Sequence, residues 1–295
     1  MERILNQSME IKKNELLKNH TSFKIGGPAD EFCSVSSEKE IIELVEYAKE
    51  KGIPCTIMGN GSNLLVADKG IRGLVVKIAK GFDEVEILGE RVIAKAGILL
   101  SKLSNMVADA GLSGMEEVSG IPGTLGGAIY MNAGAYGGEM KAIVEKVTYF
   151  SDGEIKVATK DELDFGYRHS RFSGTDDIIL SAELVLKKAD IQEIREKMAD
   201  FKERRCTKQP LSMPSAGSTF KRPEGYFAGK LIEDSQLKGF SIGGAQVSEK
   251  HSGFVINTGD ATAQDVLDLI HHIQNTVYEK FGVKLETEVK MLGEF

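Results

Sequence analysis

Two stretches of small residues have the composition of loops that hold a phosphate group. Residues 59–63 read Gly-Asn-Gly-Ser-Asn directly after an apolar segment, and residues 119–128 contain four glycines in ten positions. Small residues let backbone N–H groups surround a pyrophosphate, and Ser62 and Asn63 add side-chain donors. The first stretch has Leu64 where the dinucleotide fingerprint G-x-G-x-x-G needs glycine, and the second lacks the Lys-Ser/Thr pair of a nucleotide-hydrolysing loop. Together they favour a dinucleotide held by backbone donors over phosphoryl transfer, with an ordinary tight turn as the alternative for the first stretch.

Three further segments carry side chains that could take part in a reaction. Arg168 follows Tyr167, and an arginine beside an aromatic ring can clamp a carboxylate. Ser218 lies in a run of small residues without a G-x-S-x-G elbow, which argues against a hydrolytic nucleophile. Glu286 and Glu288 have the spacing that places two carboxylates on one face of a strand. Taken singly, each segment also fits a surface ion pair, a turn hydroxyl or a solvated strand edge.

The cysteines and histidines do not form a metal site or a disulfide framework in the sequence. Cys33, Cys55 and Cys206 are far apart and never form a C-x-x-C pair, so we expect reduced core thiols. The five histidines include no H-E-x-x-H motif, and His271 and His272 are adjacent on an expected helix, where two ligands could not converge. No metal is therefore assigned.

The elements that must position these segments begin with a β-α-β unit. The pattern Ser37-x-x-Glu40 is a capping box that opens a helix, and Gly52 ends it. Apolar segments at 31–36 and 55–58 flank this helix, and residues 74–78 form another short strand. The apolar face of the helix comprises Ile41, Ile42, Leu44, Val45 and Ala48.

The middle of the chain changes to short strands around a glycine-rich region. Residues 111–138 contain nine glycines in 28 positions, where the chain average would give about three. We expect strands at 85–88, 91–96, 144–150 and 177–186, a turn at Asp152-Gly153, and a helix near 100–111.

A later helix opens at Asp190-x-x-Glu193 and ends at residues 202–205, and the Pro210 and Pro214 dipeptides interrupt any continuation. The last part predicts a helix at 262–280 and a strand at 285–292. The first 18 residues predict a small amphipathic helix on Ile4, Met9, Ile11, Leu16 and Leu17.

Composition bounds the class of protein. The 295 residues suffice for one to three domains, with 41% hydrophobic and 27% charged residues and a formal net charge of -7. No apolar run approaches the about 18 residues of a membrane helix, and the charged N-terminus lacks a secretory pattern. The acidic excess disfavours a nucleic-acid coat but permits a local basic pocket. We therefore expect a cytoplasmic protein that acts on metabolites.

Seven segments in this order closely resemble one family, the UDP-N-acetylenolpyruvoylglucosamine reductases (MurB) of peptidoglycan precursor synthesis. The resemblance runs from residue 19 almost to the end of the chain. The segments are NHTSFKIGGPAD (19–30), GNGSNLLVADKGIRGLVV (59–76), SGIPGTLGGAIYMNAGAYG (119–137), FGYRHSRF (165–172), QPLSMPSAGSTFKRP (209–223), GAQVSEKHSGFVIN (244–257) and FGVKLETEVKMLGE (281–294).

This resemblance implies a mixed α/β (α+β) flavoprotein of three domains. Its FAD-binding half would be of the vanillyl-alcohol oxidase (PCMH-like) type, and a smaller α+β domain would bind the substrate. The expected domains are 1–78 together with the C-terminal strand 290–295, then 79–207, then 208–289. The implied cofactor is noncovalent FAD, with NADPH as co-substrate and UDP-N-acetylenolpyruvoylglucosamine as substrate, in a monomer.

The resemblance also assigns roles to individual residues. Arg168 and Glu288 would act at the substrate carboxylate, Ser218 would donate the proton, and Lys208 and Arg222 would meet the substrate diphosphate. The cofactor-binding residues would be Gly59, Asn60, Gly61, Ser62, Asn63, Ser119, Gly120, Pro122, Gly123, Thr124, Gly126, Gly127, Ala128 and Tyr167.

Two departures and two alternatives accompany this assignment. Longer members carry a tyrosine loop over the nucleotide sugar between the arginine and serine motifs; this chain resembles the shorter type II form, and has Arg222 where some relatives have asparagine. A flavin oxidase or dehydrogenase of the same fold is one alternative; many such oxidases link flavin to a histidine, and none occurs between His20 and His169. A catalytically silent nucleotide-sugar binding protein is the other, and would be expected to lack Ser218, Arg168 or Glu288.

Overall fold

The capping signals near the N-terminus produce the predicted helix. In the computed structural model, which describes residues 9–295, α1 (Glu38–Lys51) starts after Ser37, whose hydroxyl accepts the Glu40 N–H, and ends at Gly52 with φ 64°. The Glu40 carboxylate bonds the Ser36 N–H rather than that of Ser37, so the expected capping box is half formed. Ile41, Leu44 and Ala48 are the buried residues of its apolar face.

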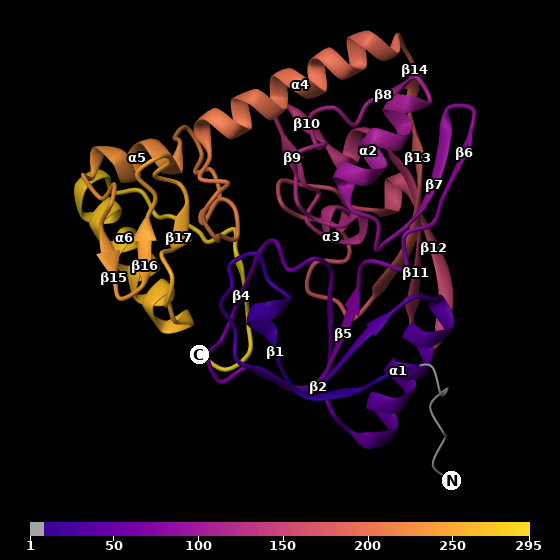
Figure 1. Cartoon of the computed structure of the whole chain (residues 1–295), viewed down its shortest axis with the longest axis horizontal. Helices are drawn as coiled ribbons and strands as arrows, with labels where there is room; N and C mark the ends of the chain where they lie inside the picture. Colours follow the sequence, from indigo (N-terminus) through magenta and orange to yellow (C-terminus); the bar gives the residue numbers. More distant parts are fainter. Residues whose placement is uncertain (1–8) are drawn as a thin grey trace. The chain divides into compact units, whose positions relative to one another are not determined.

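The helix, labelled in Figure 1, follows β2 and precedes β3 in the chain, and the four-stranded sheet that contains both strands has the order β1-β2-β5-β3. The predicted β-α-β unit is confirmed, with β5 lying between the strands that α1 connects. The strands are β1 (Lys12–Leu16), β2 (Pro28–Val35), β3 (Cys55–Met58) and β5 (Ile71–Ile78).

The expected N-terminal helix is wrong over the part that the structure describes. Residues Lys12–Leu16 form β1, antiparallel to β2 with Lys12 opposite Phe32, and a 3-10 turn η1 (Leu17–Asn19) follows. Only Leu17 becomes buried, whereas Leu16 is 42% exposed. Pairing with β2 therefore overrides the weak helical periodicity. Ile4 lies outside the described residues.

The chain divides into two compact units. The first unit comprises Cys33–Asn60 and Val75–Arg205 with the described residues before Lys12, and the second comprises Lys12–Phe32, Gly61–Leu74 and Cys206–Phe295. The backbone crosses from the second unit to the first within both β2 and β5.

A five-stranded antiparallel sheet dominates the first unit, in the order β12-β11-β13-β7-β6. It confirms the predicted strands at 85–88, 91–96, 144–150 and 177–186 and the turn at Asp152-Gly153, where both residues have positive φ; β12 was not predicted. The strands are β6 (Val85–Leu88), β7 (Arg91–Lys95), β11 (Val144–Ser151), β12 (Glu154–Thr159) and β13 (Ile178–Val185).

Short elements surround this sheet and contain the glycine-rich region. They are α2 (Leu100–Asp109), α3 (Leu125–Tyr130), the 3-10 turns η2 (Met140–Ala142) and η3 (Lys160–Glu162), and the two-residue strands β8 (Leu112–Ser113), β9 (Gly134–Ala135), β10 (Gly138–Glu139) and β14 (Lys187–Lys188).

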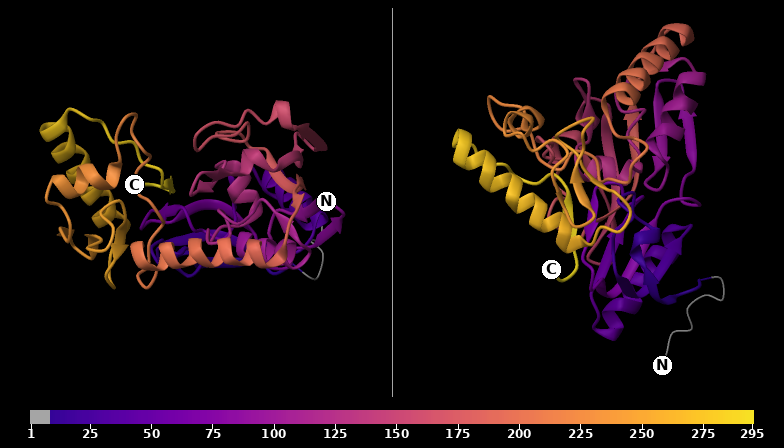
Figure 2. Two further views of the ribbon diagram at one scale, coloured as in Figure 1. Left: turned by 90° about the horizontal axis from the view of Figure 1, so that it is seen from above. Right: turned by 60° about the vertical axis from the view of Figure 1, so that its left-hand side comes forward.

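The long helix α4 (Ile191–Lys208) begins where Asp190 accepts the N–H groups of Gln192 and Glu193. Figure 2 shows it as one uninterrupted helix. It continues past the predicted end at 202–205, because the first residue pair that opposes helix is Gln209-Pro210.

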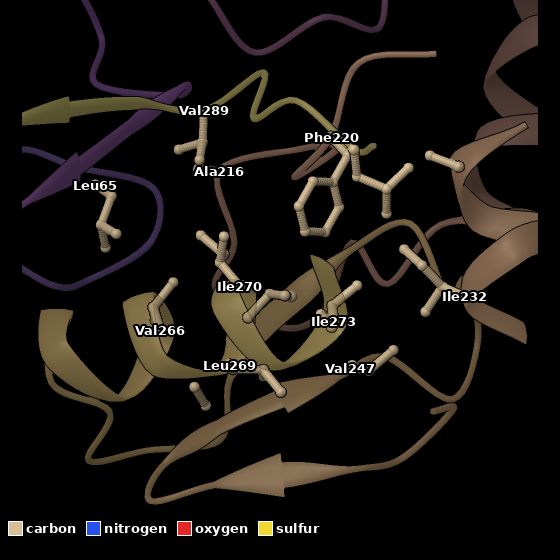
Figure 3. Close-up of a cluster of buried hydrophobic side chains, with 14 of the residues drawn as sticks. Leu65, Ala216, Phe220, Ile232, Val247, Val266, Leu269, Ile270, Ile273 and Val289 are labelled. Atoms are coloured by element: carbon tan, nitrogen blue, oxygen red, sulfur yellow. The ribbon is translucent and has the colours of Figure 1, made fainter. Parts of the chain in front are cut away.

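The second unit is built around α6 (Ala263–Phe281), close to the predicted 262–280. Its apolar face, including Val266, Leu269, Ile270 and Ile273, lies in one cluster with Phe220 (Figure 3). Each such buried side chain contributes about 1.5–3 kcal/mol of hydrophobic stabilisation. The surrounding elements are α5 (Ala228–Asp234) and the antiparallel strands β15 (Ser241–Ile242), β16 (Ala245–Val247) and β17 (Val255–Asn257).

The predicted strand 285–292 is shorter than expected. Only β18 (Lys290–Leu292) forms, parallel to β4 (Leu64–Val66), whose three residues set its length. The preceding residues run outside regular structure apart from a bridge between Thr287 and Phe220. Among the helices of residues 9–295, none is long and apolar enough to cross a membrane.

Candidate active site

The two glycine-rich stretches meet in the first unit. The Asn60 side chain donates through Nδ2 to the Pro122 carbonyl at 2.7 Å. A Cβ atom on Gly59 would lie 2.4 Å from Thr124 Oγ1, so only glycine fits there without a shift. The structure therefore brings together residues of the two candidate phosphate loops that sequence reasoning had identified separately.

Part of the second stretch is helical rather than loop. Thr124 caps α3 by accepting the Gly127 N–H, and the N–H groups of Leu125 and Gly126 bond to Ile98 and Ala96 carbonyls. A Cβ atom on Gly126 would come within 3.0 Å of Ala96 Cβ. Close packing explains this glycine, and the backbone N–H groups of Leu125 and Gly126 are already bonded within the protein.

Each of the two stretches also contains backbone N–H groups that are not used within the described residues 9–295. In the part of the chain that the structure describes, no backbone hydrogen bond is donated by the N–H groups of Gly61, Ser62, Gly123 or Thr124. Neither Ser62 nor Gly123 is fully buried. Uncommitted N–H groups on small residues are the donor set that phosphate oxygens require.

Arg168 lies at the tip of a two-residue turn. Gly166 and His169 exchange backbone hydrogen bonds of 3.0 and 3.3 Å, which close the turn around Tyr167 and Arg168. Arg168 has the left-handed φ of 55°, a conformation that costs a non-glycine residue about 1 kcal/mol. Its guanidinium donates to the Gly134 carbonyl at 3.3 Å and lies 4.9 Å from the centroid of the Tyr167 ring. The turn thus holds a partly buried cation beside an aromatic side chain that is 49% exposed.

In the second unit, the residue that follows Ser218 is hydrogen-bonded to Glu288. The Glu288 N–H donates to the Thr219 carbonyl at 2.9 Å, and the Lys221 N–H donates to the Glu286 carbonyl at 2.8 Å. Glu288 and the residues just after Ser218, which are distant in the sequence, therefore share one short ladder.

Thr219 fixes this ladder from the other side. Its N–H donates to the Gly253 carbonyl at 2.9 Å, and its Oγ1 accepts the Val255 N–H at 3.0 Å. Its side chain is buried, at 4% exposure. The Ser218 hydroxyl itself forms no hydrogen bond to another of the described residues 9–295.

His251 supports the same segment. Its Nδ1 accepts the Gly253 N–H at 3.1 Å, which assigns the remaining proton of the neutral ring to Nε2. Burial lowers the pKa of His251 below its ordinary value. The residue belongs to one of the segments that carried the family resemblance, but its type and spacing alone gave no reason to select it.

The first glycine-rich stretch reaches this ladder through Asn63. The Asn63 side chain donates through Nδ2 to the Glu288 carbonyl at 3.2 Å, and its own carbonyl accepts the Lys290 N–H at 2.9 Å. Asn63 and Glu288 therefore belong to one hydrogen-bonded framework.

The remaining candidates lie on exposed surface. Lys208 is exposed at the end of α4, and the exposed Arg222 places its guanidinium 4.0 Å from the centroid of the Phe227 ring. Glu286 pairs with Lys221 at 3.1 Å and its side chain is 74% exposed, which matches the solvated-edge interpretation. Of the two nearby carboxylates, Glu288 is thus the partly buried one.

Comparison with known proteins identifies the family. A model of the C-terminal domain of UDP-N-acetylenolpyruvoylglucosamine reductase matches residues 209–292, and a model of an FAD-binding domain matches residues 29–159. The chain is 58% identical over 282 residues to the UDP-N-acetylenolpyruvoylglucosamine reductase of Alkaliphilus oremlandii, with 95% of this chain and 93% of that protein covered. It is 52% identical over 286 residues to the corresponding enzyme of Clostridioides difficile, covering 97% and 94% of the two chains.

A solved structure agrees with these sequence matches. The crystal structure of the reductase (MurB) from Thermus caldophilus superposes with a TM-score of 0.85 at 38% identity, covering 97% of this chain and 100% of that one. Together with the FAD-binding model, this match confirms the predicted mixed α/β flavoprotein fold. The chain belongs to the family of UDP-N-acetylenolpyruvoylglucosamine reductases, FAD-dependent oxidoreductases of peptidoglycan precursor synthesis.

Proposed function

We propose that this enzyme uses NADPH to reduce the enolpyruvyl double bond of UDP-N-acetylenolpyruvoylglucosamine, with Arg168, Ser218 and Glu288 acting on the substrate. The observation that supports the assignment of residues is the ladder that bonds Thr219, next to Ser218, to Glu288, together with the bond from Asn63 to Glu288. A proton donor must have a fixed position, and these bonds restrain the backbone next to Ser218.

When bound, FAD would supply the redox chemistry, which is hydride transfer from the nicotinamide to C3 of the enolpyruvyl ether. The residues of the chain would bind and position the flavin. The uncommitted backbone N–H groups of the two stretches, those of Gly61, Ser62, Gly123 and Thr124, are the proposed donors to the pyrophosphate, and α3 follows directly after Thr124. Tyr167, with its half-exposed ring, is the candidate contact to the isoalloxazine.

Arg168 stabilises the negative charge that develops on the substrate. Hydride addition at C3 leaves enolate charge at C2 and on the neighbouring carboxylate. A guanidinium fixed by its turn and by the Gly134 carbonyl stabilises this charge most as it develops. Its left-handed backbone conformation is the kind of local strain that accumulates at functional sites.

Ser218 delivers a proton to C2 of the enolate. A serine hydroxyl is a weak acid, but an adjacent enolate is a strong base, so an oriented O–H group suffices. Glu288 acts at the substrate carboxylate. Its backbone position is set by Thr219 and Asn63.

Two exposed basic side chains are the proposed contacts to the substrate diphosphate. Lys208 and Arg222 are suited to the diphosphate, which needs positive charge without full burial.

We further infer a type II monomer that acts in the cytoplasm, where its nucleotide-linked substrates occur. Its FAD-binding domains would be 1–78 (with 290–295) and 79–207, and its substrate domain would be 208–289. The pairing of β18 with β4 supports grouping 290–295 with the first domain.

The decisive experiment separates the two half-reactions in Ser218→Ala. Anaerobic stopped-flow should show flavin bleaching by NADPH within a few-fold of wild type, because the hydride path to the flavin does not involve the hydroxyl. Reoxidation by the enolpyruvyl substrate should slow by about 10²–10⁴, the usual contribution of a general acid. Ser218→Cys, which retains a donor, should recover part of that rate.

The outcomes also distinguish the alternatives. If both half-reactions slow equally, or neither slows, Ser218 is not the proton donor. A wild-type protein that binds FAD and the nucleotide sugar but is not bleached by NADPH would be a silent binding protein. One whose reduced flavin reacts with oxygen but not with the enolpyruvyl substrate would be an oxidase.

A further inference from the structure

Asn132 is a buried polar residue that the mechanism above does not use. Its exposure is 0%, and it has a left-handed backbone with φ 41°. Its side chain makes three hydrogen bonds: Nδ2 donates to Glu139 Oε2 at 3.0 Å and to the Gly166 carbonyl at 2.9 Å, and Oδ1 accepts the Lys141 N–H at 2.9 Å. Both protons of the amide and its oxygen are therefore engaged.

The first two bonds lead to the two anchor points of Arg168. Gly166 closes the two-residue turn on which Arg168 lies, by its reciprocal bonds to His169. Glu139 pairs with Gly134 in the β9/β10 hairpin, and the Gly134 carbonyl accepts the Arg168 guanidinium. One amide group thus fixes the backbone of Arg168 on one side and the acceptor of its side chain on the other.

We propose that Asn132 is a positioning residue that sets the place of the Arg168 guanidinium. The inference rests on the proposed role of Arg168 in the reduction of the substrate. This position requires a side chain with two hydrogen-bond donors, which face the Glu139 carboxylate and the Gly166 carbonyl, and one acceptor, which faces the Lys141 N–H. An amide has these groups, and a carboxylate does not. Asparagine also tolerates the left-handed backbone better than other residues with a side chain.

The test is Asn132→Asp in the holoenzyme. The variant keeps the size and backbone tolerance, but turns an acceptor toward Glu139 and Gly166 and so releases the turn. Flavin reduction by NADPH should stay within about three-fold of wild type. Reoxidation by the enolpyruvyl substrate should slow by about 10²-fold, the effect of a displacement of roughly 1 Å at a reacting group. The matched control is Asn14→Asp, an exposed asparagine with φ 54°, which should leave both steps unchanged.

A double-mutant cycle with Arg168→Lys separates this inference from the proposed function. If Asn132 acts through Arg168, Asn132→Asp should slow reoxidation by less than about three-fold further in the Arg168→Lys background. If Arg168→Lys alone leaves reoxidation unchanged, the proposed role of Arg168 is wrong. If Arg168→Lys slows it and Asn132→Asp does not, or the two effects simply multiply, the positioning role is wrong.

A second variant guards against a general loss of stability. In Asn132→Asp combined with Glu139→Gln, the glutamine amide can donate to the new carboxylate, while the Gly166 carbonyl still lacks its donor. Urea unfolding should recover toward wild type, but the reoxidation rate should not. The guanidinium Nε–H resonance of Arg168 in the flavin-free protein should shift in both Asn132 variants and not in Asn14→Asp. Recovery of the rate together with stability, or an unchanged resonance, would show that Asn132 only supports the fold.

Discussion

His251, in the segment that packs beside Thr219, makes the free energy of unfolding depend on pH. Burial lowers its pKa, and its Nδ1 accepts the Gly253 N–H, a bond that a protonated ring could not accept. In the unfolded chain the pKa of this histidine is about 6.5. As the pH falls through that value, the unfolded chain takes up a proton that the folded ring does not, so the free energy of unfolding decreases. Above that pH the imidazole of His251 is neutral in both the folded and the unfolded chain, so it no longer lowers the free energy of unfolding.

We therefore expect the free energy of unfolding to decrease from pH 7.5 to pH 5.5, and part of that decrease to vanish in His251→Gln, which has an amide oxygen to accept the Gly253 N–H. Urea titrations of both proteins at each pH measure the difference. The same substitution at the exposed His271 should leave the pH dependence as it is in wild type. An identical pH dependence in wild type and His251→Gln would refute the assignment.

At the level of single residues, the sequence predicts side chains whose chemical type suggests a reaction. It does not predict residues whose role depends only on their position in the fold. Arg168, Ser218 and Glu288 can be selected because each carries reactive chemistry within a motif. Thr219 and Asn132 act by hydrogen bonds to backbone carbonyls and N–H groups that are distant in sequence, such as Gly253 and Gly166. No local pattern records those partners, so their roles become visible only with the fold.

Among the secondary-structure elements, α6 shows best how a local signal controls structure. Thr262 and Asp265 form a full capping box: Thr262 Oγ1 accepts the Asp265 N–H at 3.0 Å, and the Asp265 carboxylate accepts the Thr262 N–H at 3.0 Å. This backbone bond from Thr262 helps to lower the pKa of Asp265. The helix carries the apolar face at the centre of the second unit (Figure 3).

Removing that cap should loosen the start of α6. Thr262→Ala should destabilise the protein by about 1 kcal/mol, the typical effect of losing an N-cap side chain. Native-state amide exchange should show faster exchange in the first turn of α6. The matched control is Thr276→Ala in the interior of the same helix, which removes a hydroxyl bonded to the His272 carbonyl and should be neutral or slightly stabilising. Equal effects at the two positions would mean that the cap is not what fixes the helix start.

Helices with their own start signals were predictable, whereas the existence of β1 and the length of β18 were not. The helices α1, α4 and α6 begin at Ser37, Asp190 and Thr262, which act as caps in the structure. In contrast, β1 forms where an amphipathic helix was expected, and β18 stops at three residues, because pairing with β2 and β4 decides both. Strand length and existence depend on non-local hydrogen bonds, which periodicity does not contain.

For the molecule as a whole, the decisive question is how the chain retains its flavin. No histidine occurs between His20 and His169, so neither glycine-rich stretch offers one for a covalent bond. Cys55 lies just before the first stretch, but burial raises its pKa to about 11, which leaves almost no thiolate to attack a flavin ring. We therefore predict that hydrogen bonds to backbone donors and packing retain the flavin.

Two measurements on the purified protein follow from noncovalent retention. Acid precipitation should release intact FAD into the supernatant and leave a colourless pellet, and wild-type protein precipitated with added free FAD controls for trapping. The flavin-free protein should also gain stability when FAD is restored, because a ligand that binds only the folded state at 100 times its Kd adds about 2.7 kcal/mol to the free energy of unfolding. Flavin that stays with the washed pellet would establish a covalent bond. A flavin-free protein whose unfolding midpoint does not rise with FAD concentration would show that the donors of the two stretches do not hold the cofactor, because mass action requires that rise for any ligand specific to the folded chain.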